Sequence, residues 1–255
     1  MKNMRPSLNK KAIEKNLNVI RPIYVSKTTG STNEDARALV KSHETAVVLS
    51  ECQTFGKGRL SRNFYSPAKE GLYMSFLLRP RLKGSDAGLI TSFAAVCVVR
   101  ALNSLTGLDA KIKWINDVVV GKKKLCGILT EGELSSSGDY SYVIIGIGIN
   151  VSQVSFPDDI SSKATSVLIE TGKDIDRNLL ASMIINEMDS ISVAIKSPDF
   201  FKEYLSYSCV VGKEFEMDGK VVRVTGIKED MSLIIEQEGK QKVCQPEEIT
   251  FHDNY

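Results

Sequence analysis

Three stretches of strand-like sequence follow one another with only short turns between them, and they constrain the fold more than any other feature. They are Lys111–Trp114 continuing into Val118–Val120, then Leu125–Glu133, then Tyr140–Asn150. Turn-forming residues separate them at Gly121-Lys122 and at Ser135–Gly138. Because parallel neighbours need a long crossover connection, usually a helix, these short turns predict an antiparallel or mixed sheet.

Helices are predicted on both sides of this region of strands. Ala-rich sequence predicts one helix over Asp86–Leu105, ending near Gly107. Another is predicted over Arg177–Lys196, where apolar residues share one face at Leu180, Ile184, Met188, Ile191 and Ile195. Shorter helical segments are expected from Thr29, over Asp199–Ser206, and within the first 20 residues, where an ordered arm is the alternative. Further strands are predicted at Ala46–Ser50 and Leu72–Arg79, separated by a long loop over Glu51–Gly71.

The pattern changes after Ser208, where short strands replace helices. Glu214–Met217 and Val221–Ile227 flank Asp218-Gly219, which is a strong hairpin signal. A second pair, Leu233–Glu236 and Lys242–Gln245, flanks Glu238-Gly239. We therefore expect an α+β domain over residues 1–207, with a mixed or antiparallel sheet flanked by helices, and a small β-barrel-like domain over residues 208–255.

Composition limits the functions that are open to the chain. The 255 residues include 33 basic and 31 acidic side chains, a net charge of +2 that gives no general attraction to nucleic acid. Five scattered cysteines, without a CxxC pair, indicate reduced thiols and a cytoplasmic location. Two isolated histidines leave little basis for a histidine metal site or a catalytic triad. No secretory signal and no apolar run long enough to span a bilayer is evident.

Two polar motifs lie in the first quarter of the chain. Taken alone, Ser31-Thr32-Asn33-Glu34 favours a capping box, in which Ser31 caps a helix and Glu34 reaches back; a small polar ligand at the helix N-terminus is a compatible alternative. The segment from Gln53 to Phe64 combines glycines with Lys57, Arg59 and Arg62, which suits phosphate, although a solvated basic loop remains the alternative. It is not a P-loop, because Gly58 rather than Ser or Thr follows Lys57.

Two further motifs accompany the predicted strands. Lys124 opens an apolar strand after Lys113-Trp114-Ile115-Asn116-Asp117, so its ammonium can lie near a pocket. Asn116 and Asp117 are either turn formers or, for Asp117, a group facing a metal-bound phosphate. Gly146-Ile147-Gly148-Ile149-Asn150 lacks the third glycine of a dinucleotide fingerprint, and its glycines allow another group to approach the backbone closely.

The four motifs in this order resemble the biotin protein ligases. That family has a Ser-Thr-Asn element, a GRGRxGR-type loop, a KWPND segment, a K-x-x-GIL strand and a GxGIN strand, and the resemblance covers residues 28–151. The C-terminal β-domain matches the family's SH3-like domain in position and size. The sequence departs from the pattern at Lys57 (for arginine), Ser61 (for glycine), Phe64 (for an aromatic that is usually tryptophan) and Ile115 (for proline).

The resemblance implies that biotin and ATP give biotinyl-AMP and pyrophosphate, after which biotin passes to a lysine of a biotin carboxyl carrier protein. Lys124, Arg59 and Arg62 are implied as catalytic, with Lys124 bridging the biotin carboxylate and the α-phosphate. The implied biotin-binding residues are Ser31, Thr32, Asn33, Gln53, Lys57, Gly58, Arg59, Lys124, Gly127 and Leu129. The implied ATP- and adenylate-binding residues are Arg59, Arg62, Phe64, Asn116, Asp117, Lys124 and Asn150, with Mg²⁺ near Asp117 or carried by the phosphates. The resemblance also leaves a homodimer open.

Three other functions compete with this one. A lipoate or octanoate ligase or transferase has a related fold, but the Gly-Lys-Gly-Arg loop and the Lys-Trp-x-Asn-Asp element favour biotin. A DNA-binding repressor is not expected, because 30 residues precede Ser31 and an independent domain needs roughly 50. A non-catalytic binding module would not be expected to keep Lys124 and the arginine loop.

Overall fold

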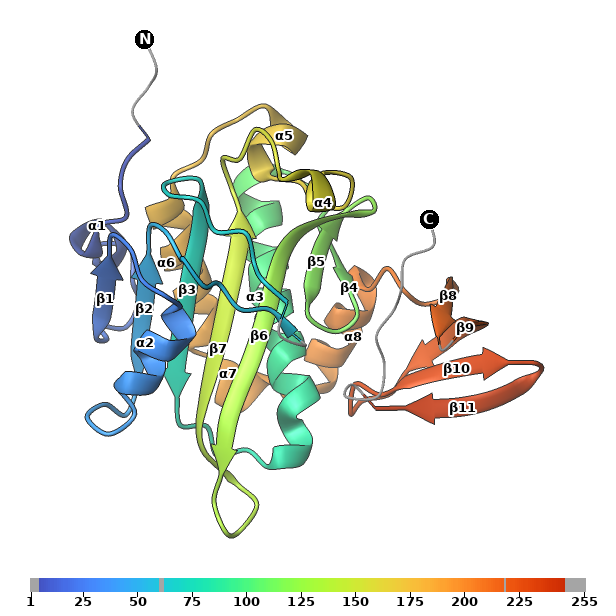
Figure 1. Cartoon of the computed structure of the whole chain (residues 1–255). Coiled ribbons are helices and arrows are strands. Elements are labelled where there is room, and N and C mark those ends of the chain that lie inside the picture. The colour runs from blue at the N-terminus through green and yellow to red at the C-terminus, as the bar shows by residue number, and fades with distance from the viewer. Residues whose placement is uncertain (1–4, 60–61, 218, 246–255) are drawn as a thin grey trace.

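A seven-stranded mixed sheet forms the centre of the protein (Figure 1). The structure, a computed structural model, describes residues 5–59, 62–217 and 219–245. Strand order is β1-β2-β3-β7-β6-β5-β4. The strands are β1 (Ile23–Ser26), β2 (Ala46–Ser50), β3 (Gly71–Leu78), β4 (Lys111–Lys113), β5 (Asp117–Val120), β6 (Lys123–Leu134) and β7 (Tyr140–Asn150). All neighbours pair antiparallel except β1 and β2, which are parallel, so the expectation of an antiparallel or mixed sheet is confirmed as mixed.

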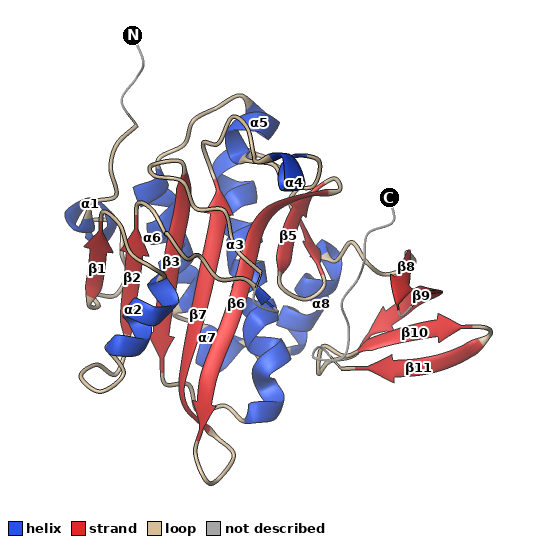
Figure 2. Cartoon of the chain, viewed as in Figure 1, coloured by secondary structure: helices blue, strands red, loops and turns tan. Residues whose placement is uncertain are grey.

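Helices lie on both faces of this sheet (Figure 2). They are α1 (Lys10–Glu14), α2 (Thr32–Ala38), α3 (Ala87–Thr106), α4 (Asp158–Ser161), α5 (Val167–Thr171), α6 (Arg177–Met188), α7 (Ile191–Ala194) and α8 (Pro198–Tyr207), with a 3₁₀ turn at Gly84–Asp86. The helices α3, α6 and α8 lie behind the sheet in Figure 1, whereas α2 lies in front of it. The central helix, α3, contacts both α6 and α8. It ends where predicted, at Gly107, whose φ of 75° is the left-handed cap conformation.

Side-chain alternation along β7 divides the sheet into an apolar and an open face. Ile145, Ile147 and Ile149 belong to the main hydrophobic core with the helices. Gly146, Gly148 and Asn150 point to the opposite face, because successive residues of a strand alternate sides. That second face is covered only in part, by α2 and a small core of Ala36, Ala46, Val48, Leu77, Tyr142 and Ile144.

The predicted helix over Arg177–Lys196 is wrong as a single element. The chain breaks after Met188 and resumes as α7 at Ile191. Asp189 pairs with Arg21, and the Ser190 hydroxyl donates to the carbonyl of Glu187, so the Ser190 side chain competes with a regular helical bond. The predicted apolar face is nevertheless correct, since all five of its residues are at least 95% buried.

The stretch Gly84–Thr106 is long and apolar enough to cross a membrane by length and composition, yet 78% of its most apolar window is buried inside the protein. It therefore behaves as the core helix of this sheet. All five cysteines lie within the described residues, and none of them is in a disulfide there.

The C-terminal strands form a second, antiparallel sheet in the order β11-β10-β9-β8. Its strands are β8 (Glu214–Met217), β9 (Lys220–Ile227), β10 (Leu233–Gln237) and β11 (Lys240–Cys244), which is consistent with the expected SH3-like domain. The predicted turn at Asp218-Gly219 includes Asp218, which lies outside the described residues. The Trp114 indole donates to the carbonyl oxygen of Met231 at 2.8 Å, which ties this sheet to the turn between β4 and β5. The division at residues 207 and 208 stays a prediction.

An N-terminal arm packs along α6. Polar side chains one helical turn apart, Asn178, Ser182 and Asn186, hold its backbone. Glu51 joins the arm to the sheet, because it accepts from the Leu8 amide and from the buried Arg177 guanidinium. Glu51 lies two residues before Gln53, so the arm supports one end of the long loop that follows.

Candidate functional site

The centre of the open sheet face lacks side chains, and this absence forms a pocket. A Cβ at Gly146 would lie 2.2 Å from Asn33 Oδ1, and a Cβ at Gly148 would lie 2.5 Å from the Phe64 ring. Such distances are far inside van der Waals contact, so only glycine fits at either position. The prediction that these glycines admit close approach by another group is therefore confirmed. The glycines thus leave a pocket on this face of the sheet.

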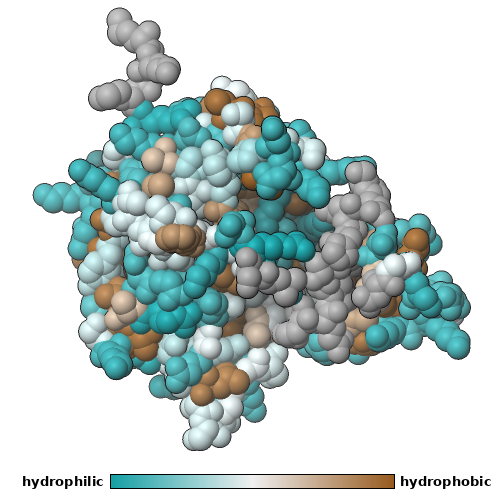
Figure 3. Space-filling model, in the orientation of Figure 1, coloured by the Kyte–Doolittle hydropathy of each residue, from teal (hydrophilic) through white to brown (hydrophobic). Residues whose placement is uncertain are grey.

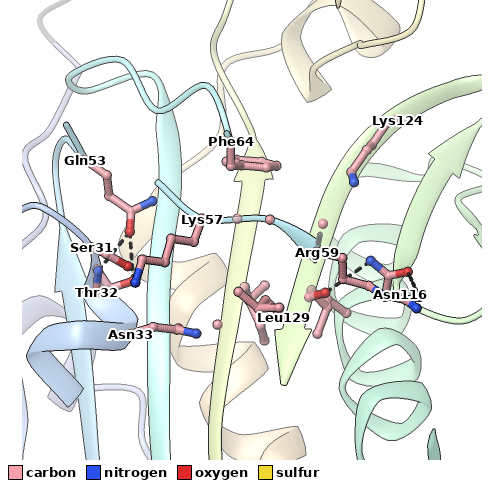
Figure 4. A pocket seen from close by; sticks show the side chains of 16 residues that line it. Ser31, Thr32, Asn33, Gln53, Lys57, Arg59, Phe64, Asn116, Lys124 and Leu129 are labelled. Carbon is pink, nitrogen blue, oxygen red and sulfur yellow. Dashed lines mark hydrogen bonds between the residues drawn. The ribbon is translucent and has the colours of Figure 1, made fainter. Parts of the chain in front are cut away.

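Most of the residues implied by the sequence resemblance meet in this pocket (Figure 4). Its lining comprises Ser31, Thr32, Asn33, Gln53, Lys57, Gly58, Arg59, Phe64, Asn116, Lys124, Gly127, Ile128, Leu129, Gly146, Ile147 and Gly148. Three implied residues, Arg62, Asp117 and Asn150, do not line it. The surrounding surface is mainly hydrophilic, with hydrophobic residues in separate areas (Figure 3).

One end of the pocket consists mainly of neutral polar groups, next to the ammonium of Lys57, which pairs with Glu34. Gln53 Oε1 accepts from the Thr32 amide at 2.9 Å and from the Thr32 hydroxyl at 3.1 Å. Gln53 Nε2 donates to the Ser66 hydroxyl at 3.0 Å, and Ser66 in turn donates to the Phe64 carbonyl. The carboxamide of Gln53 therefore links the start of α2 to the loop that carries Phe64.

The expected capping box at this helix is wrong. Ser31 occupies the N-cap position of α2, but its side chain makes no capping hydrogen bond. Gln53 instead accepts from the Thr32 amide, one of the first amides of the helix. Glu34 does not reach back to Ser31, because it pairs with Lys57 at 2.6 Å.

The basic loop is held against α2 by that ion pair. Lys57 and Glu34 are each about half-exposed, and the hydrogen bond from Lys57 is the main cause that lowers the pKa of Glu34. Backbone bonds close the loop on itself, from the Gly58 amide to the Arg62 carbonyl at 2.7 Å and from the Phe64 amide to the Gly56 carbonyl at 2.8 Å. The Phe64 ring is thereby placed over Gly127 and Gly148.

The other end of the pocket is cationic. Lys124 Nζ lies 2.6 Å from Asp117 Oδ1, and Arg59 donates to Asn116 Oδ1 at 3.2 Å. Asn116 is itself fixed, since its amide donates to Asp117 and its carbonyl accepts from the Ile128 amide at 2.8 Å. The pocket thus runs from neutral oxygen and nitrogen atoms at Thr32 and Gln53 to two cations at Arg59 and Lys124. This arrangement suits a ligand with a neutral head and an anionic tail.

Asn150 lies beside the pocket and has a local role. Its amide donates to the Thr165 carbonyl at 3.0 Å and accepts from Gln153 at 3.2 Å. These bonds support a short pairing in which the Lys124 amide donates to the Lys163 carbonyl and the Thr165 amide donates to the Lys124 carbonyl. Asn150 therefore fixes the backbone at Lys124, and its implied contact with adenine stays a prediction.

Sequence reasoning missed the residues that hold the polar end from behind. Ser75, on β3, contacts both Thr32 and Asn33, and Glu131, on β6, accepts from Asn33. Strand alternation carried a signal for Glu131, which lies two and four residues after Leu129 and Gly127 on the same face. The sequence held no signal for Ser75, because its position opposite Gly146 depends on how β3 pairs with β7.

Cys126 lies two residues after Lys124 and is fully buried. Burial raises the pKa of its thiol, which is typical of a packing residue. Among the residues that the structure describes, no group of three or more histidine, cysteine, aspartate or glutamate side chains is arranged to hold a metal ion.

Comparisons with known proteins agree with this geometry. A biotin protein ligase from Aquifex aeolicus, solved in complex with biotin and ATP, superposes with a TM-score of 0.75 and 28% identity, over 91% of this chain and 99% of that one. The bifunctional ligase/repressor BirA of Bacillus spizizenii is 40% identical over 151 residues, which is 58% of this chain and 46% of that protein. The chain thus matches about half the length of this relative. A biotin--[acetyl-CoA-carboxylase] ligase of Mycobacterium tuberculosis is 27% identical over 228 residues, 84% of this chain and 83% of that protein.

The family model for biotin/lipoate A/B protein ligases matches residues 23–150, which run from the first strand of the sheet to the end of β7 and include every residue that lines the pocket. The chain belongs to the biotin/lipoate A/B protein ligase family.

Proposed function

We propose that this protein is an ATP-dependent biotin protein ligase. It activates biotin as biotinyl-AMP with release of pyrophosphate, and then transfers biotin to a lysine of a biotin carboxyl carrier protein. The observation that carries the proposal is the polarity of the pocket, with neutral hydrogen-bonding groups at Thr32 and Gln53 and cations at Arg59 and Lys124. The relatives named as biotin ligases support the same choice.

In the first half-reaction a carboxylate oxygen of biotin bonds to the α-phosphorus of ATP, and the bond to the pyrophosphate leaving group breaks. Both reactants are anions, so their approach is opposed by charge. Lys124 and Arg59 at one end of the pocket offset that repulsion and stabilise charge on the phosphate oxygens. No protein nucleophile is required, which agrees with the buried state of Cys126.

In the second half-reaction the neutral amine of the carrier lysine attacks the acyl carbon of biotinyl-AMP. The new amide bond forms as the acyl–phosphate bond breaks, AMP leaves with the electron pair, and the amine loses a proton. AMP leaves as a phosphate monoester anion, which the same cations stabilise.

The remaining residues keep the roles that the resemblance implies. We assign the ureido head of biotin to Ser31, Thr32, Asn33 and Gln53 and its rings to the wall at Gly127 and Leu129. Lys57 and Gly58 close this end, Phe64 covers the adenine face, and Arg62, Asn116 and Asn150 complete the nucleotide site.

Mg²⁺ fits this site as a partner of the ATP phosphates. It is commonly held by one or two carboxylates together with substrate phosphates, and Asp117 supplies one carboxylate next to Lys124. Bound there, the ion would neutralise part of the phosphate charge. If Asp117 is a ligand, Asp117→Asn raises the Mg²⁺ concentration that gives half-maximal activity, and an unchanged requirement assigns the ion to the phosphates alone.

Lipoate is the natural competitor, because the family includes lipoate ligases. A dithiolane ring has no N–H group, so it could not donate to the remaining lone pairs on the oxygens of Thr32 and Asn33, whose polar atoms otherwise bond only within the protein. A site that hydrogen-bonds one substrate discriminates against an analogue that lacks the matching group. The geometry therefore favours a urea-bearing head group over lipoate or octanoate.

The experiment that tests the proposal is pyrophosphate release from ATP and Mg²⁺ with biotin, lipoate or octanoate, followed by transfer of labelled biotin to a carrier domain. Biotin-dependent release and labelled carrier are expected. Equal turnover with lipoate would contradict the biotin assignment, and adenylate formation without transfer would contradict the second half-reaction. Sedimentation in the same samples tests the homodimer, which stays a prediction.

A further inference from the structure

The Asn33 side chain is held at both ends of its carboxamide, in the polar end of the pocket. It is 96% buried, lines the pocket, and lies directly over Gly146. Its Nδ2 lies 2.7 Å from Glu131 Oε2 and its Oδ1 lies 2.6 Å from the Ser75 hydroxyl. The two ends of a carboxamide have the same shape, so their partners decide which end is oxygen and which is nitrogen.

Glu131 determines the orientation of the Asn33 carboxamide. A carboxylate only accepts hydrogen bonds, so the nitrogen of Asn33 faces Glu131 and the oxygen faces Ser75. The other carboxylate oxygen of Glu131 lies 3.2 Å from an Arg37 nitrogen, and Arg37 also pairs with Glu34. Glu131 is thus held from behind by α2, on the side away from the pocket lining.

The orientation of Asn33 determines how many hydrogen-bond donors face the acceptor oxygens at this end of the pocket. Ser75 is fully buried and lies within hydrogen-bond distance of both Asn33 Oδ1 and Thr32 Oγ1, yet its hydroxyl has one proton. The Thr32 hydroxyl directs its own proton to Gln53 Oε1. Gln53 cannot turn to relieve this, because its nitrogen donates to Ser66.

The Thr32 amide also donates to Gln53 Oε1, so Gln53 is satisfied, and the single Ser75 proton serves either Thr32 Oγ1 or Asn33 Oδ1 and leaves the other oxygen without a donor. Such an end of a pocket selects a ligand group that brings N–H donors, as a cyclic urea does. If Asn33 were turned over, its nitrogen would donate toward Ser75, and the surplus of acceptors would disappear.

We propose that Glu131 is a positioning residue that fixes the amide orientation of Asn33 and so makes the head-group end of the pocket selective for N–H donors. This inference rests on the proposed function, because biotin supplies the donors. Glu131 acts through Asn33 and needs no contact with the substrate.

The test is a double-mutant cycle on biotin affinity, measured by calorimetry with the full chain. Glu131→Gln keeps the shape of the side chain but can donate as well as accept, so Asn33 loses its fixed orientation. We expect the biotin Kd to rise about tenfold, the size of one buried hydrogen bond that is lost or misdirected. In the Asn33→Ala background the same change at residue 131 should have almost no effect. Glu133→Gln, an exposed change two residues along the same strand, is the matched control.

A second readout separates positioning from general damage. An analogue of biotin with a methylated ureido nitrogen should bind the unmodified protein much more weakly than biotin, and Glu131→Gln should narrow that preference. At saturating biotin and ATP, the rate of adenylate formation should stay within about threefold of the unmodified rate, since the cationic end is unchanged.

Each result has one meaning. Additive effects of Glu131→Gln and Asn33→Ala, or an unchanged Kd with a folded Glu131→Gln protein, overturn the positioning role while leaving biotin ligation in place. Failure of the unmodified protein to bind biotin overturns the proposed function and this inference together. Thermal unfolding of each variant shows whether the fold is kept, and a collapsed Glu131→Gln protein would make the residue structural and so also overturn the proposal.

Discussion

The ammonium of Lys124 lies 2.6 Å from a carboxylate oxygen of Asp117, so the principal cation of the pocket already has an anionic partner. The Lys124 side chain is 37% exposed and the Asp117 side chain 26%, and Lys124 lines the end of the pocket that the substrate carboxylate would enter. A substrate anion therefore competes with Asp117 for Lys124, and it meets a lysine that is already charged and positioned.

Replacing Lys124 with alanine should reduce adenylate formation by about a hundredfold to a thousandfold, because a preorganised charge at the reacting phosphate is lost. Pyrophosphate release under single-turnover conditions measures the effect. Lys123→Ala, one residue earlier on the same strand and exposed, is the control and should retain nearly full activity. A Lys124→Ala rate close to the unmodified one would place Lys124 among the solvated lysines of the hairpin.

Gly146 and Gly148 form the floor of the pocket, and adding one methyl group to Gly146 should abolish biotin binding. In Gly146→Ala the new carbon would lie 2.2 Å from Asn33 Oδ1, a side chain that is pinned at both ends and cannot withdraw. Gly226→Ala provides the comparison, since its methyl would meet Ile234 at an ordinary 3.4 Å. Calorimetric titration with biotin distinguishes the two, and normal binding by Gly146→Ala would contradict the role of the glycine floor.

The loop from Gly56 to Phe64 should close more firmly when ligand is bound, because an anion neutralises its cations and the biotin rings fill the pocket below it. Trypsin cleavage after Lys57 reports this directly. Biotin with ATP should protect the site, and Glu34→Gln should expose it in the absence of ligand. Equal cleavage in all four samples would show that neither the ion pair nor the ligand restrains the loop.

The same ion pair gives the loop a defined dependence on pH. The pKa of Glu34 is lowered in the folded protein, chiefly by the hydrogen bond from Lys57. A lowered pKa means that the contribution of the pair is complete above the ordinary glutamate value, about 4.3, and is lost as pH falls below it. Protection of Lys57 in the unmodified protein should therefore approach that of Glu34→Gln under acidic conditions, measured with an acid-active protease, and stay constant between pH 6 and about 8.

Trp114→Phe should lower the free energy of unfolding by about 1–3 kcal/mol, because the Met231 carbonyl loses the donor that now satisfies it in a buried position. Urea denaturation gives the value. If the C-terminal sheet also steadies the turn that carries Asn116, the KM for ATP should rise in the same variant. A change in stability with an unaltered KM would limit Trp114 to holding the two sheets together.

Much of the architecture could be predicted from local signals. The strands from Lys111 to Asn150 have short turns, which allow few alternatives, and Gly107 ends α3 by a conformation that glycine adopts without strain. The parallel strand β1 was not predicted, because four residues with a single buried side chain have no clear period. The break after Met188 was missed for a different reason, since the helical spacing of apolar residues continues through it, and the local bond from Ser190 to the Glu187 carbonyl leaves no mark on that spacing.

The residues that line the pocket could be predicted, but the hydrogen bonds and ion pairs between them could not. The order of four motifs brought Thr32, Gln53, Arg59 and Lys124 together correctly. Partners across the sheet stayed hidden because they depend on register, and Ser75 faces Asn33 only through the pairing of β3 with β7. Asp117 shows the same limit, since its choice of Lys124 as a partner is a tertiary contact.

The glycine floor also determines how the substrate range of this protein can be redesigned. Glycine has no side chain that a substitution could shorten. The pocket therefore cannot be deepened between β6 and β7 to accept a bulkier biotin derivative. Room has to come from the walls, and Leu129 and Phe64 are the side chains there whose shortening does not remove a charge or a hydrogen-bonding group.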